Sequence, residues 1–360
     1  MTGGQPVDGP ISVAEIAQQV YHEGAKRVVV VSDDPDRHRG TALPPETRVE
    51  HRDRLDDVQT ELREVPGCTV LIYEQTCAAE KRRRRKRGTF PNPPKRLFIS
   101  EAVCEGCGDC SVQSTCVSLT PVETNFGTKR QIDQSSCNKD YSCLNGFCPS
   151  FITIHNAEPR KQGKVAIDPT LFDSIITPAT APLGDGGYAM MVAGIGGTGV
   201  ITVAAVLGMA AHLEGKAASV FDMTGLAQKN GAVLSHVRFA ATPDRIHASK
   251  LGAGDADLVL AFDLVAALGD DSRKTFAAGR TRALVNSDVA PTVAFQFDRD
   301  AKVDLGQLQS QLEAIVGTDS VETINATGLA TALLGDSIAT NFFVVGIAVQ
   351  RGLVPIGVAA

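Results

Sequence analysis

Seven of the chain's nine cysteines lie between Cys104 and Cys148. An odd number of cysteines crowded into one short segment does not suit a disulfide framework. The N-terminus, MTGGQPVDGP, has neither the basic region nor the apolar region of an export signal. Closely spaced cysteines in an unexported chain are typical metal ligands. The segment therefore predicts metal-bound chemistry in a reducing, cytoplasmic location.

The first three of these cysteines form a C-x2-C-x2-C run. At this spacing, Cys104, Cys107 and Cys110 let one loop hold three corners of an iron–sulfur cubane, and the glycines between them let backbone amides face the sulfides. Cys148 is followed by Pro149, as a distant fourth ligand commonly is. We predict one [4Fe–4S] cluster on these four cysteines, and electron transfer as the chemistry of the segment.

Three more cysteines, Cys116, Cys137 and Cys143, are available for a second cluster. Their spacing is stretched relative to a two-cluster ferredoxin, and no internal repeat of fixed period is apparent. Three thiolates leave one corner open, for which Asp133, Asp140, water or no ligand at all are the alternatives. The sequence therefore leaves one or two clusters open.

Structural zinc is the plainer alternative for the segment. Zinc sites usually take four ligands from two separated pairs of cysteines, and three successive cysteines followed by four more fit that pattern poorly. Cys68 follows the second helical pattern and opens an apolar run, so we expect it in a core. Cys77 has no paired motif, and core packing is favoured for it as well.

The rest of the chain reads as α/β material in several parts. Residues 1–80 carry two buried parallel strands (26–31 and 68–73) and two amphipathic helices, which is too little for a complete domain. The predicted divisions are an incomplete domain, a basic and proline-rich linker that begins with KRRRRKR, the cysteine module, a second linker and a doubly wound α/β domain: 1–80, 81–96, 97–157, 158–187 and 188–355.

Strand and helix patterns alternate regularly in the last part. The predicted strands are 188–194, 217–222, 232–240, 257–262, 281–286 and 321–326. The predicted helices are 199–214, 263–269, 305–316, 326–334 and 337–351.

A glycine-rich turn follows the first of these strands. Gly194, Gly196, Gly197 and Gly199 form G-x-G-x-x-G between a strand and a helix, and Asp222 lies near the end of the next strand. This context is typical of a dinucleotide fold, in which the helix N-terminus faces a phosphate. The alternative is that the glycines only allow the strand and the helix to pack closely.

Composition argues against two classes of partner. The net charge is −6, aromatic residues make up 5% of the chain and tryptophan is absent, so we expect no nucleic-acid binding. The most apolar stretches, 188–192 and 341–349, are too short or too interrupted to span a membrane.

Six segments resemble one family. They are MTGGQPVDGP, QTCAAEKRRRRKRGTFP, CEGCGDCSVQSTC, DQSSCNKDYSCLNGFCPSF, GIGGTGVITV and GLAQKNGAVLSHVR. Together they are similar to the long fused indolepyruvate ferredoxin oxidoreductases, of the 2-oxoacid:ferredoxin oxidoreductase superfamily. The resemblance covers nearly all of the chain. It implies an internal fragment: the end of a thiamine-diphosphate-binding domain, a ferredoxin-like module and a Rossmann-like γ-type catalytic domain.

The resemblance also implies a reaction. In this family thiamine diphosphate with Mg²⁺ attacks an aryl 2-oxoacid, coenzyme A takes the acyl group, and electrons leave through iron–sulfur clusters to ferredoxin. The remaining thiamine-binding regions would come from the same or another chain, and the resemblance implies that the full enzyme is a homo-oligomer. Without them this chain is not expected to decarboxylate a substrate alone.

Particular segments take on roles under the resemblance. Lys229, in the loop 225–231, is the candidate to face the thiamine site, with an ordinary solvent-exposed loop as the alternative. At the glycine turn, coenzyme A or simple packing replaces a nicotinamide as the expectation. The run Lys81–Arg87 reads as a solvated linker, a docking patch for an acidic ferredoxin, or a surface that packs on the missing thiamine domain.

Two other functions stay open at this point. One is a reductase that pairs an iron–sulfur module with an NAD(P)- or flavin-binding Rossmann domain. The other is a zinc-stabilised binding module without redox chemistry.

Overall fold

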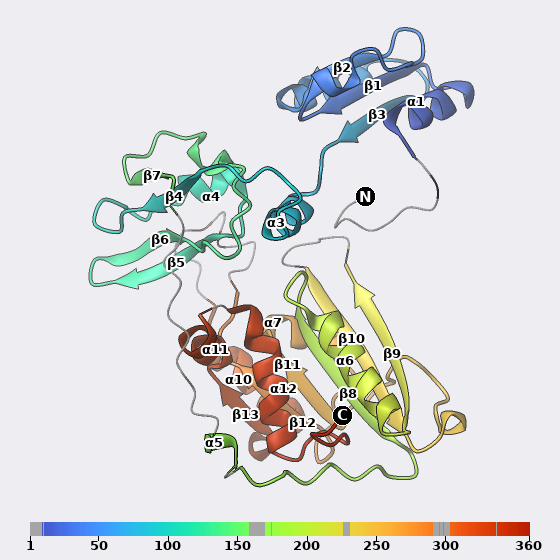
Figure 1. Ribbon diagram of the computed structural model, residues 1–360, viewed down its shortest axis with the longest axis vertical. Helices are drawn as coiled ribbons and strands as arrows, with labels where there is room; N and C mark the ends of the chain where they lie inside the picture. The colour runs from blue at the N-terminus through green and yellow to red at the C-terminus, as the bar shows by residue number, and fades with distance from the viewer. Residues whose placement is uncertain are drawn as a thin grey trace. The chain divides into compact units, whose positions relative to one another are not determined.

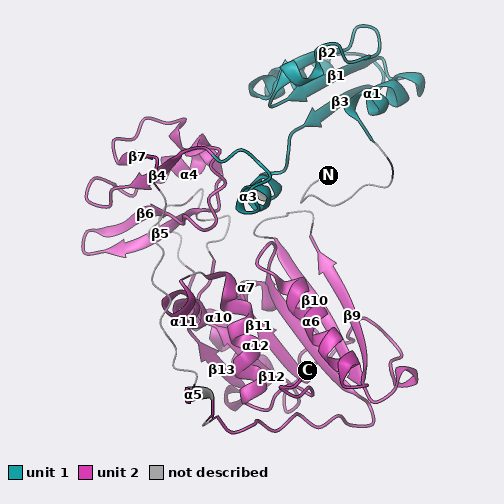
Figure 2. Ribbon diagram, viewed as in Figure 1, with its two compact units in different colours: residues 1–92 teal, residues 93–360 magenta. Residues whose placement is uncertain are grey.

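The computed structural model describes residues 9, 11–157, 170–173, 175–225, 231–290, 295, 298, 303–335 and 337–360 (Figure 1). The chain divides into two compact units between Asn92 and Pro93 (Figure 2). The elements of the first unit are α1 (Val13–His22), β1 (Arg27–Ser32), β2 (Arg48–His51), α2 (Leu55–Arg63), β3 (Thr69–Glu74) and α3 (Ala78–Lys86).

A three-stranded parallel sheet forms the core of the first unit, in the order β2-β1-β3. The run Val28–Val31 is buried throughout, because its side chains alternate between two covered faces. Val28 and Val30 pack toward α1, whereas Val29 and Val31 pack toward α2. The predicted buried strand is therefore confirmed.

The first unit contains one feature that depends on neighbouring residues and one that depends on residues distant in sequence. The Ser12 side chain accepts the N–H of Glu15, and the Glu15 carboxylate accepts the N–H of Ser12, so these two neighbouring residues form a capping box. In contrast, we did not predict β2. This strand has only four residues, ends in charged side chains and pairs on one side only, so it lacks an apolar run.

The second unit begins with a small module that contains two antiparallel pairs of strands. Its elements are β4 (Lys95–Ile99), α4 (Asp109–Ser114), β5 (Leu119–Thr124), β6 (Gly127–Ile132), the 3-10 turn η4 (Ser142–Leu144) and β7 (Phe151–His155). Strand β4 pairs with β7, and β5 pairs with β6, both antiparallel. The first and last strands thus close the module, and the two cysteine loops lie between strands.

A six-stranded sheet dominates the remainder of the unit. Its elements, with the flanking helices, are α5 (Thr170–Asp173), β8 (Tyr188–Ile195), α6 (Val200–Leu213), β9 (Ala217–Thr224), β10 (Ala232–Ala240), β11 (Leu258–Ala261), α7 (Leu264–Ala267), α8 (Asp270–Arg273), β12 (Arg282–Asn286), α10 (Leu305–Val316), β13 (Val321–Ile324), α11 (Ala326–Leu334) and α12 (Thr340–Gln350).

Helices cover both faces of this sheet (Figure 1). Met190 and Val192 of β8 pack in the cluster that contains α6 and α12. Met191 and Ala193 pack in the cluster that contains α7 and α10. The alternation of side chains along a strand therefore serves two cores from one continuous apolar run.

The sheet is mixed rather than parallel throughout. Its order is β13-β12-β11-β8-β10-β9, and β10 runs antiparallel to both β8 and β9. The predicted doubly wound arrangement holds for β8, β11, β12 and β13, which pair in parallel. It is wrong for the β9–β10 hairpin, because hydrophobic runs predict strands but not their direction.

Along the part of the chain that the structure describes, we find no helix that is both long and apolar enough to cross a membrane.

His236 is a buried titratable group one strand from the edge of this sheet. It lies on β10 and has no exposed surface, and its Nδ1 accepts the N–H of Leu251 at 3.1 Å. Burial, together with the charges of Lys250 and Arg238, lowers the pKa of the imidazole to about 4. The fold therefore holds this histidine neutral.

We predict that His236 makes the second unit less stable in acid. The folded pKa lies below the unfolded pKa, so stability is complete above about pH 6.5 and is lost as pH falls toward 4, by about 3 kcal/mol in all. His236→Gln keeps an acceptor for Leu251 but does not titrate. Urea unfolding across this pH range should show a flatter pH dependence for the variant, and an equal slope in both proteins would contradict this account.

Candidate metal centre

The two cysteine loops are two copies of one strand–loop–strand unit. Cys104 lies five residues beyond the end of β4, and Cys137 lies five residues beyond the end of β6. At the other end, Cys116 lies three residues before β5 begins, and Cys148 lies three residues before β7 begins. The expectation of no internal repeat is therefore wrong for this module.

The backbone of the two loops repeats as well. The second and fourth residues after the leading cysteine are left-handed in both copies. They are Gly106 (φ 70°) and Gly108 (φ 83°) in the first, and Lys139 (φ 54°) and Tyr141 (φ 63°) in the second. The fourth residue caps a helical turn in each copy, α4 after Gly108 and η4 after Tyr141. Because the second copy uses non-glycine residues at these strained positions, its sequence hides the likeness.

Each loop also turns a backbone amide toward its first sulfur. The N–H of Gly106 donates to Sγ of Cys104 at 3.4 Å, and the N–H of Lys139 donates to Sγ of Cys137 at 3.4 Å. An N–H directed at a sulfur stabilises the thiolate form, which is the form that binds metal. Both loops thus have the local geometry of a thiolate site.

The four cysteines predicted to hold the first cluster line one cavity of about 240 Å³. Cys104 and Cys110 are buried, Cys148 is half-buried and Cys107 is exposed. The Cys148 sulfur lies 3.0 Å from the Ser150 hydroxyl. Residues about forty positions apart in sequence therefore meet at one hollow, and thiols are groups that can bind iron.

A buried arginine, which the sequence analysis did not identify, also lines this cavity. Arg130 of β6 is 1% exposed, and its guanidinium stacks 4.1 Å from the centre of the Phe295 ring. Burial raises the pKa of Cys110 to about 11, while the Ser111 hydroxyl and the Arg130 charge oppose that rise. Metal binding here must therefore displace a proton from sulfur, and the arginine favours the resulting negative charge.

The other three cysteines form a second group. Burial is the largest cause that raises the pKa of Cys143 to about 12, and the neighbouring Cys116, Cys137 and Asp140 add to it. The pKa of Cys137 is raised by burial and again by Cys116 and Asp140. Cys116 from the first copy thus lies with the second group, and Cys148 from the second copy lies with the first.

Within the described residues, no three His, Cys, Asp or Glu side chains converge closely enough to hold a single metal ion. The ligands of a single ion must all reach one point. In a [4Fe–4S] cubane each thiolate binds a different iron, so its ligands surround a volume instead. The cavity, rather than a point of convergence, is thus the relevant geometry for the predicted group.

The glycine turn packs closely between β8 and α6. A Cβ placed on Gly194 would lie 2.8 Å from a methyl carbon of Val200 and 3.2 Å from Cβ of Phe262. Gly197 (φ 87°) and Gly199 (φ 101°) are left-handed, and Gly199 caps the N-terminus of α6. Close packing therefore accounts for Gly194, and backbone conformation for Gly197 and Gly199.

Two other members of the predicted turn have protein partners. The N–H of Gly196 donates to the carbonyl of Gly231 at 2.8 Å. Asp222 accepts a hydrogen bond from the Ser235 hydroxyl at 2.5 Å. Strand β10 separates the strand that carries Asp222 from β8, so this carboxylate does not lie on the strand next to the turn.

An asparagine distant in sequence supports the turn. Asn341, buried at the start of α12, donates from Nδ2 to the carbonyl of Thr198 at 3.2 Å. Nothing near Asn341 in sequence indicates this contact. Lys229, the candidate to face a thiamine site, lies outside the described residues.

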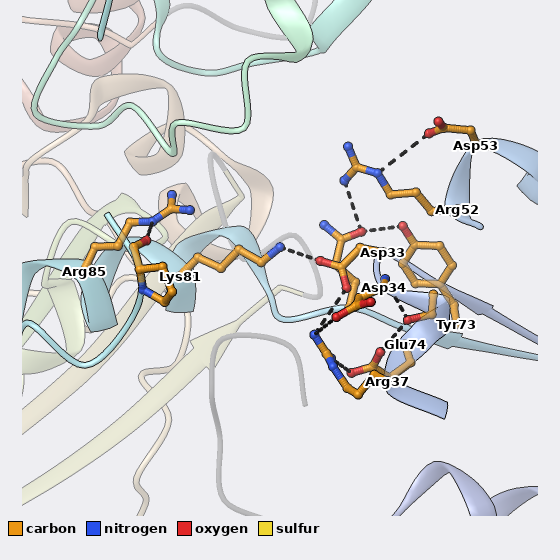
Figure 3. Close-up of polar contacts among 12 residues, drawn as sticks. Asp33, Asp34, Arg37, Arg52, Asp53, Tyr73, Glu74, Lys81 and Arg85 are labelled. Carbon is orange, nitrogen blue, oxygen red and sulfur yellow. Dashed lines mark hydrogen bonds and ion pairs between the residues drawn. The ribbon is translucent and has the colours of Figure 1, made fainter. Parts of the chain in front are cut away.

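The basic run is helical rather than extended. Residues 81–86 belong to α3, and the Lys81 ammonium lies 2.7 Å from the Asp33 carboxylate, with both side chains largely covered (Figure 3). Asp33 directly follows β1, whereas Glu74 is the last residue of β3 and binds Arg37 at 2.6 Å. Lys81 therefore joins a polar network at the carboxyl edge of the first sheet.

Cys68 and Cys77, the two cysteines of the first unit, were both expected to pack in a core. Cys68 is exposed, so the prediction that it lies in a core is wrong. It falls just before β3, where its carbonyl accepts the N–H of Lys26 and its side chain is outside the sheet. Cys77 is half-buried at the N-terminus of α3.

Comparison with known proteins identifies the domain that contains the six-stranded sheet. A family model described as pyruvate ferredoxin/flavodoxin oxidoreductase matches residues 189–359. These residues therefore form an oxidoreductase domain of that family, which supports the resemblance to the 2-oxoacid:ferredoxin oxidoreductase superfamily. The glycine turn lies within this domain.

Two curated relatives of the oxidoreductase carry the name indolepyruvate oxidoreductase subunit IorB. That of Pyrococcus horikoshii is 36% identical over 22% of this chain and 39% of its own length. That of Methanothermobacter thermautotrophicus is 27% identical over 45% of this chain and 77% of its own length. A solved structure, the pyruvate oxidoreductase subunit PORC of Thermotoga maritima, is 18% identical over 47% of this chain and 79% of its own, with a TM-score of 0.33.

We predict that Gly106→Ala disrupts the first cysteine loop of the oxidoreductase. Its Cβ would lie 2.3 Å from the carbonyl oxygen of Thr128, in a left-handed conformation that alanine disfavours. Gly127→Ala is the matched control, because Gly127 is also left-handed but has open space around it. Iron retained on purification should fall markedly for Gly106→Ala only. Equal losses in both variants would assign the effect to backbone strain alone.

Proposed function

We propose that this chain is the iron–sulfur and γ-type portion of an indolepyruvate ferredoxin oxidoreductase. The observation that carries the proposal is that four cysteines of a ferredoxin-like spacing line one cavity in a chain that also contains an oxidoreductase domain. The names of the curated relatives support an aryl 2-oxoacid, indolepyruvate, as the substrate of the whole enzyme. The function of the portion is to carry electrons away from the oxidised substrate.

The residues of the cavity fit a [4Fe–4S] cluster. Thiolate sulfur is the donor that such clusters take, and the cavity offers four thiols and an amide directed at one of them. Cys104, Cys107, Cys110 and Cys148 would hold the cluster. When bound, it supplies reversible transfer of one electron at a time.

The surrounding side chains have separate tasks in this scheme. Burial of Cys104 and Cys110 excludes water from two of the sulfurs. The positive charge of Arg130 favours the thiolate forms, and so favours deprotonation of Cys110 on loading. The same charge favours the added negative charge of a reduced site.

The remaining chemistry lies largely outside the chain in this proposal. Thiamine diphosphate with Mg²⁺ would be bound by regions that another segment or chain supplies, and coenzyme A would be the acyl acceptor. The glycine turn is our candidate for a phosphate-bearing ligand such as coenzyme A, through Gly197 and Gly199 at the start of α6. Lys229 remains the candidate to face the thiamine site. The isolated chain should not decarboxylate a 2-oxoacid.

The proposed partners follow from the same reaction. Ferredoxin accepts the electrons, the missing thiamine-binding regions complete the active site, and the whole enzyme is a cytoplasmic homo-oligomer. A nicotinamide or flavin reductase and a zinc-stabilised module are not favoured, since the oxidoreductase family of residues 189–359 is named for ferredoxin or flavodoxin.

An iron and acid-labile sulfide count on anaerobically purified protein tests the proposal. We expect about eight of each per chain if both cysteine groups are filled, or about four if only the first is. Reduction with dithionite should produce an EPR signal from the cluster. Zinc without sulfide would instead establish a structural metal site, and bound flavin would favour the reductase.

A ligand substitution assigns the first cluster. Cys107→Ala or Cys110→Ala should lower the iron content, because no spare cysteine of the first group remains to replace either thiolate. Cys68→Ala is the matched control, an exposed cysteine of the other unit. Iron analysis with EPR distinguishes them, and full iron content in Cys107→Ala would exclude the assignment.

A further inference from the structure

We infer that Asp140 is the fourth ligand of a second cluster, together with Cys116, Cys137 and Cys143. The inference rests on the proposed function, because it assumes that the first group binds iron and sulfide. It extends that function by naming a carboxylate as an iron ligand in the second group.

The register of the repeat places Asp140 at the position of a cysteine. In the first copy, Cys107 lies midway between Cys104 and Cys110, three residues from each. In the second copy, Asp140 lies midway between Cys137 and Cys143, again three residues from each. The motif C-x2-C-x2-C thus becomes C-x2-D-x2-C, with no insertion or deletion inside the loop.

The backbone conformation around Asp140 is also the same as that around Cys107. Left-handed residues flank both positions, Gly106 and Gly108 around Cys107, and Lys139 and Tyr141 around Asp140. The same amide-to-sulfur hydrogen bond precedes each. Cys107 and Asp140 are also the exposed members of their groups, so both copies present one accessible ligand beside buried or half-buried ones.

The hydrogen bonds of the Asp140 carboxylate agree with this position. Its hydrogen bonds with the Ser142 N–H and hydroxyl both go to Oδ1, at 3.4 and 3.1 Å. One carboxylate oxygen engages the turn, and the other is the atom that we assign to iron.

Asp133 was the other carboxylate considered as a fourth ligand, and it lies outside the second loop. It lies four residues before Cys137 and precedes the loop. Its Oδ1 accepts both the N–H and the hydroxyl of Ser135, at 2.9 and 2.8 Å, and its carbonyl accepts the N–H of Cys137. In the first copy the residue at this position is Ser100, whose carbonyl accepts the N–H of Cys104. Asp133 therefore shapes the entry to the loop.

A carboxylate changes the character of the site. Oxygen is a harder donor than sulfur and holds iron less firmly within a sulfide cluster. The iron at Asp140 is thus the one that leaves first, which converts a four-iron cluster into a three-iron cluster while all of the sulfide stays. The exposure of Asp140 gives that iron a route to solvent.

The test compares Asp140→Ala, Asp140→Cys and Asp133→Ala in the full chain, purified anaerobically. We expect about eight iron per chain in the unaltered protein and a loss of about one iron, but no sulfide, in Asp140→Ala. Loss of Fe²⁺ leaves a reduced three-iron cluster, and only its oxidised form gives the expected EPR signal. Asp140→Ala should therefore gain that signal after mild one-electron oxidation with ferricyanide. Asp140→Cys should restore the iron and lack that signal, and Asp133→Ala should match the unaltered protein.

Other outcomes overturn the inference. Unchanged iron and spectra in Asp140→Ala, or the new signal in Asp133→Ala instead, would exclude Asp140 as a ligand. About four iron in the unaltered protein, unaffected at Asp140, would leave the proposed function intact and remove the second cluster. Absence of iron and sulfide from the unaltered protein would overturn the proposed function itself. If Asp140→Ala does not fold, the EPR spectrum of dithionite-reduced Asp140→Cys decides. Replacing a carboxylate ligand of iron by a thiolate must change that spectrum relative to the unaltered protein, so an identical spectrum would exclude Asp140 as a ligand.

Discussion

The burial of thiol groups is the interaction on which the cysteine module depends. Its core cluster of buried residues consists of Ile99, Cys104, Cys110 and Leu119. Two of these four are cysteines, and Cys116 and Cys143 pack against the cluster. A module of this size has little apolar surface to bury, so the buried cysteine side chains account for much of its core. The left-handed turns and inward amides of both loops serve that arrangement.

The six-stranded sheet uses a different means of stabilisation. Its central strand, β8, is covered on both faces by separate hydrophobic clusters. Asn286, at the end of β12, donates to the carbonyl of Phe262 and accepts the N–H of Ala326, so it links two strands to the start of α11. Apolar packing on both faces of the sheet is therefore the main source of stability in this domain.

Local patterns predicted most of these elements. Val28–Val31 and the two-faced run of β8 follow from periodicity, and Cys104, Cys107 and Cys110 from spacing, because in each case the signal lies in consecutive residues. The meeting of Cys148 with the first loop agrees with the proline that follows it. The direction of β10 and the contact from Asn341 to the glycine turn were not predictable, since both depend on residues far apart in sequence.

The repeat within the module was missed for another reason. Its second copy replaces both left-handed glycines with Lys139 and Tyr141 and one cysteine with Asp140, so few identities survive. What the copies share is backbone conformation and the distance of each cysteine from a strand, and neither is visible before the strands are known.

The exchange of Cys116 and Cys148 between the two groups has a consequence for assembly. Each half of the module contributes its last cysteine to the group of the other half. Filling one group therefore restrains a segment that the other group needs, and lowers the entropy that the second event must overcome. If both groups bind clusters as proposed, their loading is therefore expected to be cooperative.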